Sequence, residues 1–173
     1  MSRPARGPSA LQRLAAAKRA GGQRAFVAVD PGAHGRAVLF DESGQPVRVY
    51  DIADPSELRR AIVSSGVYTV VVESQYCSPK NPPSSILLAQ AAGAVVGALS
   101  VDRDRPVVVY WVSPSTWQNA LFGGGKTRAA LAELTETAGR KWGVHELEGF
   151  PRAKIDREGA FSAAGIGKWW SKA

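Results

Sequence analysis

The sequence of 173 residues has few of the features that mark secreted or membrane proteins. It contains one cysteine, Cys77, so it forms no intramolecular disulfide and fits a reducing cytoplasm. No apolar run approaches the roughly 20 residues that a membrane span needs. The N-terminus is basic but lacks the continuous apolar core of a secretory signal. These absences predict a cytoplasmic protein with no membrane partner.

Acidic residues are also missing from the start of the chain, although the whole sequence is basic at +7. The first 29 residues carry six basic and no acidic side chains, whereas the other 144 carry 16 basic and 15 acidic ones. We expect residues 1–24 to be a largely disordered basic arm, which either contacts phosphates or only aids solubility. Residues 25–173 have the length and the apolar content of one domain with a full core.

Apolar runs and turn residues predict a defined order of elements. Three short strands at 25–30, 35–41 and 46–51 form an antiparallel meander. A helix then starts at the capping signals Asp54, Pro55 and Glu57. The remaining predicted elements are a buried strand at 68–73, a helix at about 85–99, a buried strand at 106–112, a short helix capped by Ser113, a glycine loop at 123–125, and helices at about 127–142 and 157–170. This order predicts an α/β fold with a mixed five-stranded sheet and helices on both faces.

Carboxylates stand at the ends of two of the predicted strands. Asp30 follows an apolar run and precedes Pro31-Gly32, and Glu73 ends a second apolar run. Asp156 stands at the start of the last predicted helix. Each acid has a structural alternative, as a turn former, a strand-end cap or an N-cap. Together they favour a site for Mg²⁺, which prefers oxygen ligands and can assist phosphodiester hydrolysis.

Four segments in this order resemble RuvC-type Holliday junction resolvases of the RNase H-like superfamily, in particular the divergent phage members. The first is Val-Ala-Val-Asp-Pro-Gly at 27–32, and the second is Val-Val-Glu-Ser-Gln-Tyr at 71–76. The third, at 87–93, is similar to the family's Gln-Ala-Arg-Gly helix with Ala92 in place of the arginine. The fourth runs from Ser113 through the glycine loop to Lys126.

The resemblance implies an RNase H-like fold and a role for each candidate residue. Asp30, Glu73 and Asp156 would hold Mg²⁺, for which Mn²⁺ would substitute, and Lys126 would act on the scissile phosphate. Arg128 would contact neighbouring phosphates, and His34, in the turn after the first strand, could approach one too. Tyr76 would stack on a junction base, a contact worth roughly 1–3 kcal/mol. The alternatives are a buried tyrosine and an incidental turn histidine.

The chain departs from the family on its last helix. The family places two acids three residues apart, and the second falls on Gly159 here. Glu158 is nearby, but an offset of two residues from Asp156 is about 200° around a helix. Three acids are therefore enough, or Glu158 replaces the missing ligand, or metal affinity is reduced.

The resemblance also implies a homodimer, because two symmetric cuts in a four-way junction need two sites related by a two-fold axis. The small-residue helix at 85–99 is the candidate interface, unless its small side chains serve packing against the sheet. We therefore expect a Mg²⁺-dependent, structure-selective endodeoxyribonuclease that cleaves Holliday junctions or other branched DNA. The alternatives are a junction-binding protein that has lost catalysis and a broader flap or fork nuclease. The sequence leaves open whether the protein serves recombination, repair or phage DNA processing.

Overall fold

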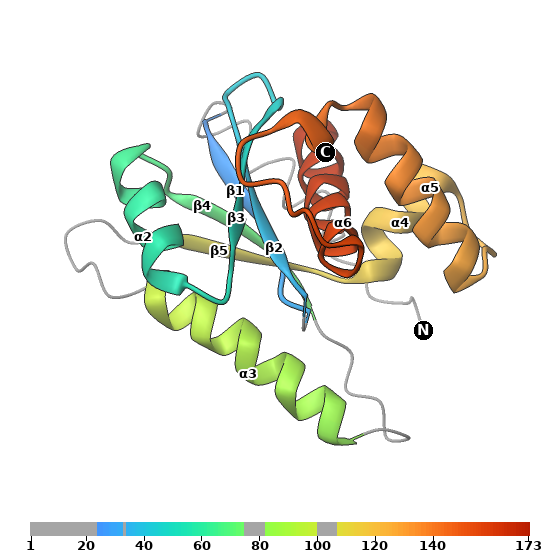
Figure 1. The fold of residues 1–173 in the computed structure, drawn as a ribbon, viewed down its shortest axis with the longest axis horizontal. Coiled ribbons are helices and arrows are strands. Elements are labelled where there is room, and N and C mark those ends of the chain that lie inside the picture. The colour runs from blue at the N-terminus through green and yellow to red at the C-terminus, as the bar shows by residue number, and fades with distance from the viewer. Residues whose placement is uncertain (1–23, 33, 75–81, 100–106) are drawn as a thin grey trace, which may run out of the picture.

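The computed structural model describes residues 24–32, 34–74, 82–99 and 107–173 (Figure 1). Residues 1–23 of the predicted arm, and Tyr76, lie outside the described residues. The elements follow the predicted order: β1 (Phe26–Asp30), β2 (Arg36–Phe40), β3 (Pro46–Asp51), α2 (Pro55–Ser64), β4 (Thr69–Glu73), α3 (Pro82–Leu99), β5 (Val108–Val112), α4 (Pro114–Phe122), α5 (Arg128–Lys141), the 3₁₀ turn η1 (Val144–Glu146) and α6 (Lys154–Lys172).

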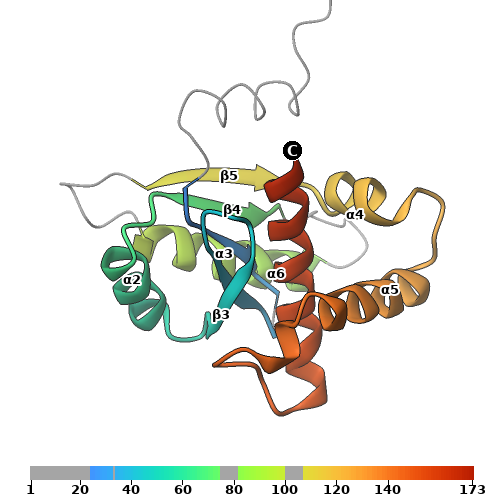
Figure 2. The same cartoon turned by 90° about the horizontal axis from the view of Figure 1, so that it is seen from above.

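The five strands form one mixed sheet in the order β3-β2-β1-β4-β5. β1, β2 and β3 pair antiparallel as a meander, whereas β4 is parallel to both β1 and β5. The helices lie on both faces, with α6 on one side and α2 and α3 on the other (Figures 1 and 2). The predicted fold class is confirmed.

Successive side chains of β1 point to opposite faces of the sheet, and the core has one layer on each face. Phe26 and Ala28 pack toward α6, and Val27 and Val29 pack toward α2 and α3. Successive strand residues point to opposite faces of a sheet, so the face of any strand residue follows from its position. By this parity Asp30, the next residue on the side of Ala28, belongs to the α6 face.

The predicted helix caps are present. The Asp54 carboxylate accepts the backbone N–H groups of Ser56 and Glu57 at the start of α2. Ser113 accepts the N–H of Thr116 at the start of α4. Each helix begins with a proline, which lacks the N–H that a first turn leaves unpaired. Within the described segments, no helix combines the length and the apolarity needed to cross a membrane.

The prediction of a buried strand at 106–112 was wrong in one respect. β5 lies at the edge of the sheet among the described residues, and Val108 and Trp111 are 48% and 51% exposed. An apolar run indicates a strand, but it does not show whether neighbours cover both of the strand's faces and both of its edges.

Candidate active site

Asp30 and Glu73 end neighbouring strands at the same edge of the sheet. β1 and β4 run parallel and pair up to Val29 and Val72, and the next residue of each strand is the acid. Both acids continue the side of the strand that packs against α6. The structure therefore brings these two predicted site residues together on one face.

Asp30 lies in a partly buried position that disfavours its charge. Burial raises the pKa of Asp30 to about 6, and the negative charge of Glu158 adds to the rise. The Gly32 N–H, which donates to Asp30 Oδ1 at 3.0 Å, and a hydrogen bond from Ser162 lower the pKa in part. Two carboxylates that repel each other in a desolvated place have the electrostatics that a cation relieves.

Glu158 and Ser162 reach Asp30 from the same helix. They stand four residues apart on α6, so they lie on one face of it. The acid on α6 whose charge acts on Asp30 is therefore Glu158. Glu158 was among the predicted candidates and Ser162 was not, although its spacing from Glu158 could have indicated it.

Glu73 is oriented by Trp117, which was not among the predicted site residues. Trp117 of α4 is 1% exposed, and its indole N–H donates to Glu73 Oε1 at 2.8 Å. Its ring lies against Gly165 of α6, where an added Cβ would come within 2.6 Å of the ring. A buried tryptophan needs a hydrogen-bond acceptor for its indole N–H. This requirement was the signal in the sequence that could have indicated Trp117 as a partner of a buried carboxylate.

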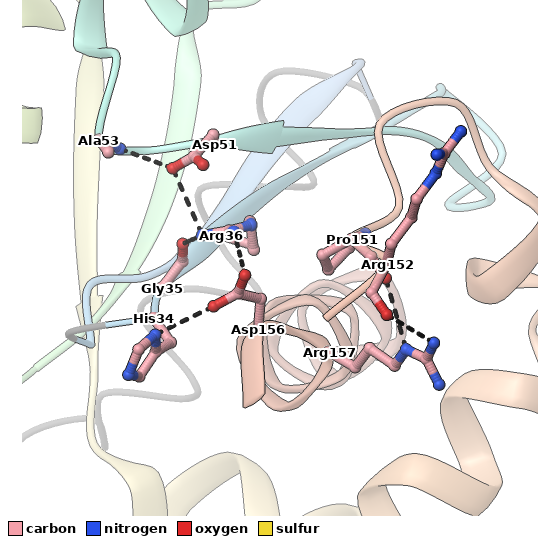
Figure 3. Close-up of polar contacts among 9 residues, drawn as sticks. All are labelled: His34, Gly35, Arg36, Asp51, Ala53, Pro151, Arg152, Asp156 and Arg157. Atoms are coloured by element: carbon pink, nitrogen blue, oxygen red, sulfur yellow. Dashed lines mark hydrogen bonds and ion pairs between the residues drawn. The ribbon is translucent and has the colours of Figure 1, made fainter. Parts of the chain in front are cut away.

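The Asp156 carboxylate contacts His34, in the turn between β1 and β2, and Arg36, the first residue of β2 (Figure 3). Its Oδ1 lies 3.0 Å from His34 Nδ1, and its Oδ2 lies 3.3 Å from an Arg36 nitrogen. Arg36 in turn contacts Asp51 at 3.3 Å. Helix α6 begins at Lys154, earlier than predicted, so Asp156 falls within the first turn and not at its cap. Its role as a metal ligand stays a prediction.

Gly159, the position of the missing acid, has no room for any side chain. An added Cβ would clash with the His34 carbonyl oxygen and come within 3.1 Å of Gly35 Cα. The β1–β2 turn therefore occupies the space into which a side chain at this position would point. The close contact between the turn and the helix accounts for a glycine at this position.

The predicted basic residues lie where the α4–α5 connection meets α5, Lys126 on the connection and Arg128 as the first residue of the helix. Lys126 and Arg128 are both exposed. Their predicted contacts with DNA stay a prediction.

The donor set at the sheet edge suits a hard cation. Asp30, Glu73, Glu158 and Ser162 offer only oxygen, the ligand that Mg²⁺ and Mn²⁺ prefer. Among the residues that the structure describes, no group of three or more acidic, histidine or cysteine side chains is close enough to hold a metal ion. Glu158 is exposed, and a bound cation would offset the burial and repulsion that raise the pKa of Asp30. The residues present therefore fit the group in the kind of ligand atom they offer.

No protein-family model matches the sequence, and no curated protein matches it. The fold is similar to that of T. thermophilus RuvC in complex with a Holliday junction substrate, with a TM-score of 0.53, 17% identity and coverage of 84% of this chain and 92% of that one. A second Thermus thermophilus RuvC structure has a TM-score of 0.49 and 17% identity, with coverage of 86% of this chain and 95% of that one. The yeast mitochondrial Holliday junction resolvase Ydc2 has a TM-score of 0.48 and 12% identity, with coverage of 87% of this chain and 80% of that one. The first match shows that this chain has a RuvC-like, RNase H-like fold, as the sequence predicted.

Proposed function

We propose that this protein is a divalent-metal-dependent endonuclease that hydrolyses phosphodiesters in branched DNA, with the four-way junction as its substrate. The observation that carries the proposal is the placement of Asp30 and Glu73 side by side on the α6 face, with Glu158 acting on Asp30. The RuvC-like fold supports it, because the similar T. thermophilus protein was solved with a Holliday junction.

Asp30, Glu73 and Glu158 would hold Mg²⁺ or Mn²⁺ at this edge. A bound divalent cation supplies a Lewis acid and lowers the pKa of a bound water. The protein's own contribution is orientation. Trp117 fixes one oxygen of Glu73, and the Gly32 N–H and Ser162 fix the carboxylate of Asp30.

Basic residues and an aromatic residue would contact the DNA. We assign Lys126 to the scissile phosphate and Arg128 to its neighbours, because both are exposed and lie two residues apart at the start of α5. Tyr76, outside the described residues, would stack on an opened base. The basic arm, residues 1–24, would add a salt-dependent contribution to affinity.

A homodimer on α3 belongs to the same proposal. Ala92, Val95 and Leu99 of α3 are buried, so one face of the helix already packs inside the protomer. An added Cβ at Gly93 or Gly97 would meet nothing within 4 Å. Packing within the described residues therefore does not explain why those two positions are glycine. A second copy that approaches this face closely does explain it. Sedimentation of the protein and of a Gly93→Glu variant tests the interface, and the variant should be monomeric.

Incubation of a labelled four-way junction with the protein and Mg²⁺ or Mn²⁺ tests the activity. We expect paired, symmetric nicks, and we expect Asp30→Asn to abolish cleavage while junction binding persists. Binding without nicks under either metal would identify an inactive junction-binding protein instead. Flaps and plain duplexes in parallel reactions distinguish a junction enzyme from a broader flap or fork nuclease.

A further inference from the structure

One side of α6 acts on the acid at the end of β1, and Ile155 stands at the outer end of that side. An α-helix has about 3.6 residues per turn, so side chains seven positions apart point in almost the same direction. Ile155 and Ser162 are seven positions apart on α6, and Glu158 lies between them. Glu158 and Ser162 both act on Asp30. Ile155 therefore continues the same side of the helix, about one turn beyond Glu158.

Ile155 is open to solvent, although the next turn of the helix is covered. The backbone of the β1–β2 turn rests on Gly159, which is buried and follows Ile155 by four residues. Ile155 itself is 62% exposed. Among the large apolar residues that are exposed in the described part of the chain, Ile155 is the one that belongs to α6. An apolar side chain is thus presented to solvent a single helical turn from Glu158.

Basic side chains flank Ile155 in the sequence. Arg152 and Lys154 are exposed. Arg157 donates to two backbone oxygens of the segment that precedes α6, at 3.4 and 2.7 Å, so it ties this segment to the first turns of the helix (Figure 3). The two acids of the same stretch are engaged elsewhere, with the β1–β2 turn and with Asp30. The outer end of α6 therefore combines an apolar side chain with cations on both sides, which suits a ligand that has anionic edges and apolar faces.

We propose that Ile155 packs against an unstacked base of branched DNA, with Arg152 and Lys154 on the neighbouring phosphates. The inference rests on the proposed function. The three residues from Ile155 to Glu158 rise about 4.5 Å along the helix, and one strand of a DNA duplex advances about 3.4 Å per nucleotide. A strand whose phosphate lies at Glu158 therefore brings a base about one or two nucleotides away up to Ile155. Stacking covers both faces of a base in a continuous duplex, whereas a branch point leaves a face open to an aliphatic side chain. Ile155 accordingly favours branched DNA over plain duplex.

A single exposed isoleucine is also ordinary on a protein surface and needs no function. Two features favour the contact with DNA. Ile155 lies on the side of α6 that acts on Asp30, and exposed cations flank it. Without a role in binding, truncation of Ile155 would change nothing that depends on branching. Val63 is the matched comparison, because it is 47% exposed and belongs to α2, on the opposite face of the sheet (Figure 2).

The test measures how the full-length protein binds a four-way junction and a plain duplex in EDTA, where the junction stays uncut. We expect Ile155→Ala to bind the junction about 10-fold more weakly and the duplex with unchanged affinity, because only the junction offers a base face that buries the side chain. Arg152→Ala should weaken binding to both DNAs alike, and Val63→Ala should match the wild type. The fluorescent base 2-aminopurine, placed at the branch point, should brighten when the wild type binds and brighten less with Ile155→Ala.

Three results would overturn the inference. Ile155→Ala that binds the junction like the wild type, or that loses affinity for junction and duplex equally, would exclude a contact with an open base while the wild type still cuts the junction. A changed sedimentation rate of Ile155→Ala without DNA would show that Ile155 contacts a second copy of the chain instead. A wild-type protein that neither binds nor cuts branched DNA would refute the proposed function, and the base contact with it.

Discussion

Replacing Asp30 by asparagine should abolish cleavage and yet stabilise the metal-free protein at neutral pH. The carboxylate is partly buried, and its pKa is raised from 3.8 to about 6 because burial and the charge of Glu158 disfavour ionisation. Asparagine carries no charge and keeps an oxygen that can accept the Gly32 N–H. The variant therefore removes an electrostatic penalty and retains the local hydrogen bond.

The magnitude follows from the shift in pKa. One pKa unit corresponds to about 1.4 kcal/mol, so a shift of about two units corresponds to at most about 3 kcal/mol, and residual solvent contact reduces it. The folded state holds the Asp30 proton more tightly than the unfolded chain does. The contribution of Asp30 to stability is therefore lost as the pH rises from about 4 through about 6, and it stays constant above that range. The advantage of Asp30→Asn should grow across this window.

Urea denaturation in EDTA at pH 4.5 and pH 8 measures the effect. We expect Asp30→Asn to gain little over the wild type at the lower pH and most of the roughly 3 kcal/mol at the higher one. Asp41→Asn is the control of opposite sign, because hydrogen bonds from the Gln45 N–H and from Ser43 lower the pKa of Asp41. Added Mg²⁺ should stabilise the wild type alone. A parallel pH dependence in Asp30→Asn and the wild type would refute the reasoning.

Four further predictions concern the surroundings of the acids. Trp117→Phe removes the hydrogen-bond donor to the Glu73 carboxylate and should lower metal affinity by about 10-fold in calorimetry. Unchanged affinity would show that the indole contributes only to core packing. Lys126→Ala should slow single-turnover cleavage without changing the melting temperature, and a wild-type rate would exclude this lysine from the site. Gly159→Ala should destabilise the fold by about 1–3 kcal/mol in urea denaturation because its Cβ meets backbone. Deleting residues 1–24 should flatten the dependence of log affinity on log salt, and an unchanged slope would show that the arm does not bind DNA.

Local signals were sufficient for the elements and for two of the acids. Asp54 and Ser113 cap helices as predicted, and the apolar runs before Asp30 and Glu73 form adjacent parallel strands. The edge position of β5 could not be predicted, because a single strand's sequence does not specify its neighbours. The start of α6 was also misplaced, since Ala153 provides no side-chain cap to mark it.

The sequence by itself determined the α/β order, the RuvC-like resemblance, and the two carboxylates at the strand ends, because these depend on local periodicity and on residue type. Only the tertiary structure decided which side chains of α6 and α4 meet those carboxylates. Glu158 faces Asp30, and Trp117 bonds to Glu73 across 44 residues. Gly159 is glycine because a turn distant in sequence touches it. Such contacts are set by how helix and sheet pack together, which no short stretch of sequence encodes.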